Sequence, residues 1–342
     1  AAPTRFPGDK IILNDSQRMI QDTMRDFARE PLAPHAAEWD RQSRFPAEVL
    51  QELAALGACG MVVPEAWGGA GLDFLSLAVT LEEIAAGDGA TSTILSVQNS
   101  LVCGILNRYG SDAQKDRWLR GAASGELLGC FCLTEPHVGS DAGAIRTRAT
   151  KSGDGWVLNG TKQFITSGRN AKIAIVFAVT DPAAGKKGLS CFLVPTDTPG
   201  YHVARLEDKL GQHASDTAQI LFEDCRIGAD CLLGAEGDGY RLALANLEAG
   251  RIGIASQSVG MARSALEAAL AYAREREAFG KPILEHQAVA FRLADMSTRI
   301  EAARHLVWHA ACLRDAGQPC LKEASMAKLF ASEMAEQVCS DA

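Results

Sequence analysis

Residues 129–143 read Gly129-Cys130-Phe131-Cys132-Leu133-Thr134-Glu135-Pro136-His137-Val138-Gly139-Ser140-Asp141-Ala142-Gly143. The first part alternates cysteine with Phe131 and Leu133 and carries no charge, which predicts a strand covered on both faces. Pro136 ends that strand because proline has no N–H for a neighbouring strand. The following Gly-Ser-Asp-Ala-Gly run can expose several backbone N–H groups beside a hydroxyl, an arrangement that suits a nucleotide pyrophosphate. An ordinary strand followed by a polar turn is the alternative.

The composition around this stretch is globular, with 47% hydrophobic and 22% charged residues among 342. A chain of this length predicts two or three domains. The net charge of −8 argues against nucleic-acid binding, which requires a basic face. No apolar run approaches the ~20 residues that span a bilayer. The ten cysteines show no Cys-x-x-Cys or zinc-type spacing, which indicates unpaired thiols in a reducing compartment.

Residues 1–125 predict an N-terminal helical domain. A helix with one apolar face begins after Asn14, a residue type that caps helices. Pro31 and Pro34 are expected to break this helix, and Pro46 begins another at a position that favours proline. Further helical segments with short connections follow, as in other all-helical domains.

Residues 126–236 show a different pattern, in which strand-length apolar runs alternate with turn residues. Because βαβ alternation is missing, we expect a compact, mostly antiparallel, β-barrel-like domain rather than a Rossmann sheet. The Asn159-Gly160 pair between two strand-like runs predicts a hairpin turn. Over residues 237–342 the helical period returns, and a broad apolar stripe within 287–313 predicts a C-terminal helical bundle. The expected fold class is therefore α+β, with a β-domain between two helical domains.

Five motifs in this order resemble those of the acyl-CoA dehydrogenases. They are Cys132-Leu133-Thr134-Glu135-Pro136, Gly139-Ser140-Asp141, Phe164-Ile165-Thr166, Gly250-Arg251-Ile252-Gly253-Ile254-Ala255 and Arg276-Glu277-Ala278-Phe279-Gly280-Lys281-Pro282. The resemblance extends from about residue 10 to residue 342 and is closest to the short-chain and short/branched-chain members. It implies a flavoprotein with FAD that converts a short straight or branched acyl-CoA to the trans-2-enoyl-CoA. It also implies an electron-transfer flavoprotein as electron acceptor, and a homotetramer in a bacterial cytoplasm or a mitochondrial matrix.

The resemblance also implies site residues. Those expected to contact FAD within one subunit are Phe131, Leu133, Thr134, Gly139, Ser140, Phe164, Ile165 and Thr166. Those expected to reach the FAD of a neighbouring subunit are Arg276, Phe279 and Gln287. Those expected to bind the acyl-CoA are Ser140, Glu248 and Arg251.

Plainer interpretations of these residues stay open. Phe164, where many relatives have tryptophan, can be a core aromatic residue. Arg276 and Gln287 can be solvated surface residues, and Arg251 can be a structural ion-pair partner.

The catalytic residue is left unassigned by the same pattern. Most of the family carries its catalytic glutamate in a Tyr-Glu-Gly-Thr-like segment, which this sequence lacks. The last helical pattern has no stop signal, so we expect a chain cut short and that glutamate beyond Ala342. Isovaleryl-type relatives place the glutamate at the position of Gly250, where no carboxylate occurs. Glu135, in the predicted flavin turn, is interpreted as a structural carboxylate.

Two rival functions follow from the missing segment and from the flavin itself. One is an acyl-CoA oxidase, in which oxygen reaches the flavin, and the other is a non-catalytic flavin- or acyl-CoA-binding scaffold. A third interpretation concerns metal, because Glu301, His305 and His309 follow at four-residue spacing. No separate ligand cluster accompanies them, so no metal site is predicted.

Overall fold

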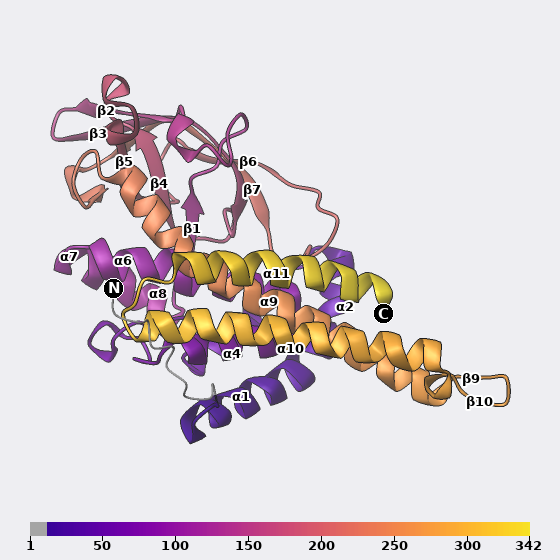
Figure 1. The fold of residues 1–342 in the computed structure, drawn as a ribbon. Coiled ribbons are helices and arrows are strands. Elements are labelled where there is room, and N and C mark those ends of the chain that lie inside the picture. Colours follow the sequence, from indigo (N-terminus) through magenta and orange to yellow (C-terminus); the bar gives the residue numbers. More distant parts are fainter. Residues whose placement is uncertain (1–11) are drawn as a thin grey trace, which may run out of the picture.

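The structure, a computed structural model, describes residues 12–342, with helical regions on both sides of a β-domain in the chain (Figure 1). The helices are α1 Asp15–Phe27, α2 Ala33–Gln42, α3 Ala47–Ala55, α4 Phe74–Gly87, α5 Gly89–Ser96, α6 Gly104–Tyr109, α7 Asp112–Gln114, α8 Arg120–Ser124, α9 Gly239–Glu275, α10 Gln287–Asp315 and α11 Leu321–Asp341. The strands are β1 Gly129–Cys132, β2 Arg148–Ser152, β3 Gly155–Thr166, β4 Ile173–Val179, β5 Leu189–Pro195, β6 Tyr201–Leu206, β7 Thr217–Ile227, β8 Leu232–Leu233, β9 Glu277–Ala278 and β10 Lys281–Pro282.

The N-terminal helices begin as predicted, but the prolines act differently. Asn14 and Gln17 form a capping box at the start of α1, each side chain accepting a hydrogen bond from the other's backbone N–H. Pro31 lies inside a π-helical turn, 28–32, that joins α1 to α2. Pro34 lies in the first turn of α2, where a missing N–H is not needed. The expectation that both prolines break the helix is therefore wrong, because a wider turn carries the helical path past them.

The β-domain is one eight-stranded mixed sheet with the strand order β6-β7-β3-β2-β4-β5-β8, and β1 pairs with β4. Most pairs are antiparallel, as predicted, whereas β1 runs parallel to β4 over its whole length. The two faces of β1 are both covered. Cys130 and Cys132 belong to the core inside the β-domain, and Leu133 belongs to a second core shared with the N-terminal helices, against which Phe131 packs.

The predicted hairpin at Asn159-Gly160 is wrong. Strand β3 continues through this pair, with a register shift against β7 between Leu158 and Gly160. Gly160 has φ +149°, and a Cβ at this position would lie 2.6 Å from the Thr147 Cα, so glycine is required by a close backbone approach. The β2–β3 hairpin instead turns at 153–154, where Gly153 has φ +62°.

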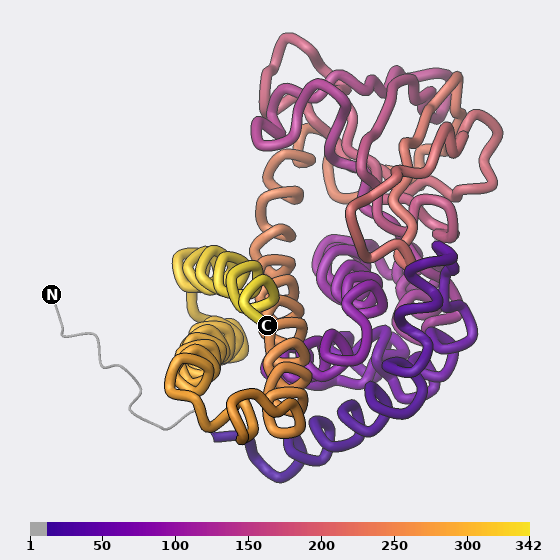
Figure 2. The backbone as a smooth tube through the Cα atoms, turned by 90° about the vertical axis from the view of Figure 1, so that its right-hand side faces the viewer, coloured from indigo at the N-terminus to yellow at the C-terminus, as the bar shows by residue number. Residues whose placement is uncertain are grey.

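The C-terminal region contains three long helices, and α9 connects it to the β-domain. In Figure 2, α9 runs from the β-domain past the N-terminal helices, with α10 and α11 beside it. Helix α4 is buried on nearly every side and packs against α1, α9 and α10. Gly260 of α9 permits this close packing, since a Cβ there would lie 2.1 Å from the Glu82 carbonyl oxygen. Within residues 12–342, no helix is both long and apolar enough to cross a membrane.

Candidate functional site

The end of β1 and the second half of β3 meet at one edge of the β-domain. The Gln163 N–H donates to the Thr134 carbonyl oxygen at 2.9 Å. This bond places the segment that follows β1 directly beside Phe164, Ile165 and Thr166. Two of the predicted flavin-contact segments, 30 residues apart in sequence at Thr134 and Phe164, are therefore neighbours in the fold.

Phe164 has an unusual conformation for a strand aromatic residue. It lies in a β-bulge, where the pairing of β3 with β7 shifts between Lys162 and Ile165. Its φ is +59°, and 62% of its surface is exposed. A left-handed backbone at an aromatic residue costs free energy, and such strain tends to occur at functional sites. The interpretation of Phe164 as a core aromatic is wrong, and the bulge directs its ring outward.

The turn after Thr134 is short and leaves its tip open. Glu135 and Val138 exchange two backbone hydrogen bonds, of 3.0 and 3.1 Å, which close a four-residue turn. Gly139 and Ser140 follow and are exposed. A Cβ added at Gly139 would meet no atom within 4 Å, so this backbone is accessible from outside. The geometry fits the predicted contact of these two residues with a pyrophosphate.

Behind this turn lies a buried ion pair. The Lys162 ammonium, which is fully buried, donates to a Glu135 carboxylate oxygen at 2.8 Å and to the Leu133 carbonyl oxygen at 3.1 Å. Glu135 also accepts from the backbone N–H groups of Arg146 at 2.6 Å and Thr147 at 2.9 Å. Glu135 is thus a structural carboxylate.

Burial and the attraction between the two groups together shift the pKa values of Glu135 and Lys162. Burial raises the pKa of Glu135, but Lys162 and the N–H donors outweigh burial, so the pKa lies below its ordinary value. Burial lowers the pKa of Lys162, and Glu135 opposes that shift only in part. Sequence reasoning does not identify Lys162, because a lysine in a strand usually faces solvent and its partner is 27 residues away.

Arg276, Phe279 and Gln287 lie at the other end of the molecule. The β9–β10 hairpin, which contains Phe279, projects beyond the ends of α9 and α10 (Figure 1). Phe279 is 97% exposed, and the other two residues are also exposed. Helix α9 has 37 residues, about 55 Å at 1.5 Å per residue, and it separates this hairpin from the β-domain. The structure therefore does not bring these residues to Thr134 and Phe164 of the same chain.

Glu248 and Arg251 lie one turn apart on α9, but their surroundings differ. The Glu248 carboxylate pairs with Arg314 at 3.2 Å and accepts from the Cys320 thiol at 3.4 Å. Arg251 is half-buried, and no ion pair to it occurs among residues 12–342. The structural ion pair considered for Arg251 is thus formed by Glu248 instead.

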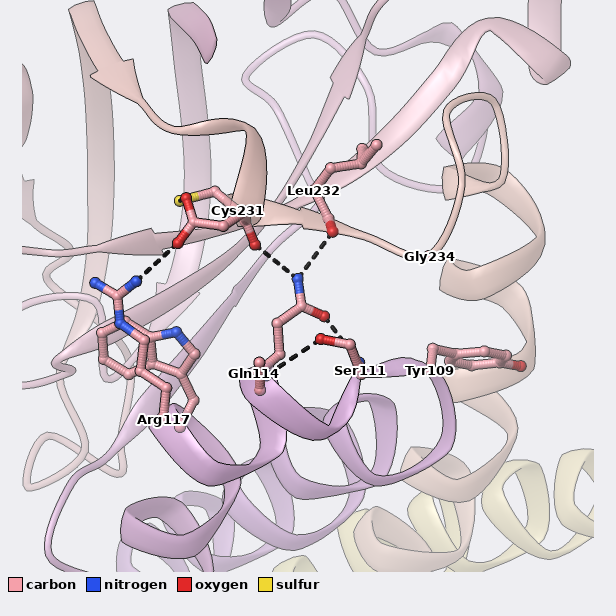
Figure 3. A pocket seen from close by; sticks show the side chains of 11 residues that line it. Tyr109, Ser111, Gln114, Arg117, Cys231, Leu232 and Gly234 are labelled. Atoms are coloured by element: carbon pink, nitrogen blue, oxygen red, sulfur yellow. Dashed lines mark hydrogen bonds and ion pairs between the residues drawn. The ribbon is translucent and has the colours of Figure 1, made fainter. Parts of the chain in front are cut away.

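A separate cavity of about 470 Å³ lies between the α6–α7 corner and β8 (Figure 3). The Gln114 amide donates to the carbonyl oxygens of Asp230 and Leu232 at 2.8 and 2.9 Å. Arg117 pairs with the Asp230 carboxylate at 3.0 Å. Because these groups are already paired with one another, they join the helical domain to the sheet and leave few free contacts for a ligand.

The His-containing stripe on α10 also has ordinary partners. Glu301 pairs with Arg304, and the His305 ring lies 6.3 Å from the Trp308 ring in an edge-on contact. In the part of the chain that the structure describes, no group of three or more His, Cys, Asp or Glu residues is placed to hold a metal ion.

Comparison with protein families gives matches to three consecutive parts of the chain. The acyl-CoA dehydrogenase N-terminal domain matches residues 14–126, the middle domain 130–225 and the C-terminal domain 237–342. The mitochondrial short-chain specific acyl-CoA dehydrogenase of Homo sapiens is 48% identical over 332 residues, covering 97% of this chain and 81% of the human protein.

Solved structures give the same picture. Butyryl-CoA dehydrogenase from Megasphaera elsdenii superposes with a TM-score of 0.94 at 40% identity, over 96% of this chain and 86% of that chain. A structure of the electron transferring flavoprotein of Acidaminococcus fermentans contains a chain with a TM-score of 0.95 at 43% identity, over 96% and 87%. A glutaryl-CoA dehydrogenase from Mycobacterium smegmatis in complex with FADH2 has a TM-score of 0.91 at 36% identity, over 97% and 84%.

Proposed function

The chain belongs to the acyl-CoA dehydrogenase family, and we propose that it oxidises short straight or branched acyl-CoA thioesters to trans-2-enoyl-CoA and passes the electrons to an electron-transfer flavoprotein. The observation that carries the proposal is the edge where Thr134 meets the strained, exposed Phe164. An aromatic face, a hydroxyl and an accessible backbone turn lie together there. The short-chain relatives support the size of the substrate.

FAD is the cofactor for which this edge is suited, and when bound it supplies the acceptor for the hydride from the β-carbon. Thr134 would hold the flavin ring, with Phe131 and Leu133 lining the same strand. Phe164, Ile165 and Thr166 would cover the ring's other side. The open backbone at Gly139 and Ser140 would bind the pyrophosphate, and Ser140 would also contact the CoA.

The substrate's α-proton needs a carboxylate base, and none is assigned within the described residues. Glu135 is buried and paired with Lys162, and Glu248 pairs with Arg314. Arg251 keeps its charge available and is the better candidate for the CoA end, since a guanidinium binds phosphate in a fork geometry. Charge that develops on the thioester oxygen would require hydrogen-bond donors placed in advance.

Assembly into a homotetramer is part of the proposal. Phe279 is 97% exposed, Phe291 66%, Leu329 59% and Leu321 53%, so the bundle presents large apolar residues to solvent. A second copy of the chain would cover them. Because the β9–β10 hairpin projects beyond the end of α9 that is remote from the β-domain, Arg276 would contact the FAD of a neighbouring subunit. All ten cysteines are unpaired, which suits the reducing interior of a bacterial cytoplasm or a mitochondrial matrix.

The test is to purify the protein expressed from its complete reading frame with FAD and to add butyryl-CoA under anaerobic conditions. We expect the yellow flavin absorbance to bleach, and to bleach faster than with a long-chain acyl-CoA. The same bleaching measured with isobutyryl-CoA and 2-methylbutyryl-CoA tests whether branched acyl chains are oxidised. Bound flavin that no short acyl-CoA bleaches would identify a binding scaffold instead, and contradict the proposal.

The electron acceptor is tested with the same reduced protein. We expect an electron-transfer flavoprotein to reoxidise it faster than molecular oxygen does. Rapid peroxide formation with butyryl-CoA, in excess of flavoprotein reduction, would identify an acyl-CoA oxidase and contradict the proposed partner.

A further inference from the structure

We propose that the buried Lys162–Glu135 ion pair is a positioning device for FAD, which holds the two flavin-facing segments, 134–140 and 164–166, in their binding geometry before the cofactor arrives. This inference rests on the proposed function. Neither residue is expected to touch the flavin or the substrate. Their role is to fix the residues that do.

The pair lies where three segments cross. Lys162 belongs to β3, two residues before Phe164, and its ammonium bonds both Glu135 and the Leu133 carbonyl oxygen at the end of β1. Glu135 in turn accepts hydrogen bonds from the backbone N–H groups of Arg146 and Thr147, which form the third segment. Glu135 is adjacent to Thr134, and Lys162 is two residues from Phe164. Removing either charge therefore releases both flavin-facing segments, 134–140 and 164–166, at the same time.

The pair also explains how the bulge in β3 is held. In a regular strand, residues 162 and 164 face the same side of the sheet. Here Lys162 is fully buried while Phe164 is 62% exposed, because the bulge between them changes the register. A slip of one residue would remove the ammonium from its buried position and leave the Glu135 carboxylate with its two backbone N–H donors but no cationic partner. The ion pair therefore selects the register in which Phe164 faces outward.

Stability alone does not account for the pair. Well-packed apolar residues of similar volume are often at least as stable as a buried ion pair. A buried ion pair, however, permits few arrangements of the backbone, because each charge is costly to bury unless it lies against its partner. A fixed arrangement of the backbone suits a site in which a ring must be bound between two segments.

The test compares Lys162→Met, Glu135→Gln and the double variant with wild type, using apoprotein prepared by removing flavin. Lys151→Met is the matched control, since Lys151 also bonds a glutamate, Glu236, at 2.8 Å but is 67% exposed. Two quantities are measured, the Kd for FAD by flavin fluorescence and the Tm of the apoprotein. We expect Lys162→Met to raise the Kd at least tenfold and to lower the Tm, and the control to change the Kd less than twofold.

The double variant separates positioning from stability. It leaves no unpaired buried charge, so its apoprotein Tm should return close to that of wild type, while its Kd for FAD stays raised at least tenfold. A double variant with wild-type Kd would overturn the inference, because the pair would then be structural only. If the single variants do not fold, the double variant still gives this result. Wild-type protein that binds no FAD would instead contradict the proposed function.

Discussion

Replacing Arg304 should destabilise the protein strongly, because Arg304 neutralises the buried carboxylate of Glu82. Glu82, on α4, is 3% exposed, and its carboxylate accepts hydrogen bonds from Arg304 at 2.8 and 3.0 Å. Arg263 of α9 approaches the same carboxylate at 3.5 Å. The interaction thus connects α4 to both α9 and α10. In Arg304→Met the carboxylate keeps only the longer contact.

The magnitude follows from burial. Breaking a buried ion pair by removing one partner costs about 3–5 kcal/mol, and the remaining contact to Arg263 places Arg304→Met near the lower end. Arg299→Met is the matched control on the same helix, since Arg299 pairs with Asp295 while the two side chains are 46% and 62% exposed. An exposed pair contributes about 0–1 kcal/mol.

The assay is urea unfolding followed by tryptophan fluorescence, at pH 7 and at pH 5. Burial raises the pKa of Glu82, and the two arginines oppose this shift. Without Arg304 the pKa rises further, and a carboxyl group with a raised folded-state pKa gains stability as the pH falls through that pKa. The deficit of Arg304→Met should therefore shrink at pH 5. A loss equal to that of Arg299→Met, or a deficit independent of pH, would refute this reasoning. Adding Glu82→Gln should recover much of the loss at pH 7.

Three further predictions test the packing, the pH response and the site. Gly260→Ala should lower the free energy of unfolding, measured in urea, by about 1–3 kcal/mol, because its Cβ would overlap a backbone oxygen of α4. Gly211→Ala is the control: open space surrounds its Cβ, so the free energy of unfolding should change by less than about 0.5 kcal/mol. The hydrogen bond to Asp40 raises the pKa of His213, so this contact stabilises the folded chain below the unfolded pKa of about 6.5 and is lost as the pH rises through the folded value. Hydrogen exchange in the loop around His213, corrected for intrinsic rates, should be faster at pH 8 than at pH 6, and His213→Gln should abolish the difference. Phe164→Ala should leave the apoprotein Tm almost unchanged, because the ring is exposed, but should raise the Kd for FAD; an unchanged Kd would contradict its place at the flavin.

Local chemistry in the sequence was enough to predict much of the molecule. The capping residue Asn14 marks the start of α1, and the alternation in β1 correctly indicates two covered faces. The three patterns of apolar spacing predict the helical, β and helical order, and the motifs led to the family. These features depend on residues close together in the chain, so the sequence contains them directly.

What the sequence could not determine depends on contacts between distant segments. The Asn159-Gly160 pair has the composition of a hairpin turn, yet it lies within β3, because the close approach of Thr147 needs a glycine there. The outward-facing ring of Phe164 comes from a bulge set by pairing with β7. The Lys162–Glu135 pair has no signal in the sequence at all, since it exists only when β1 and β3 are brought together. Local residues determined which elements form and to which family they belong, whereas the tertiary structure decided how the site is held.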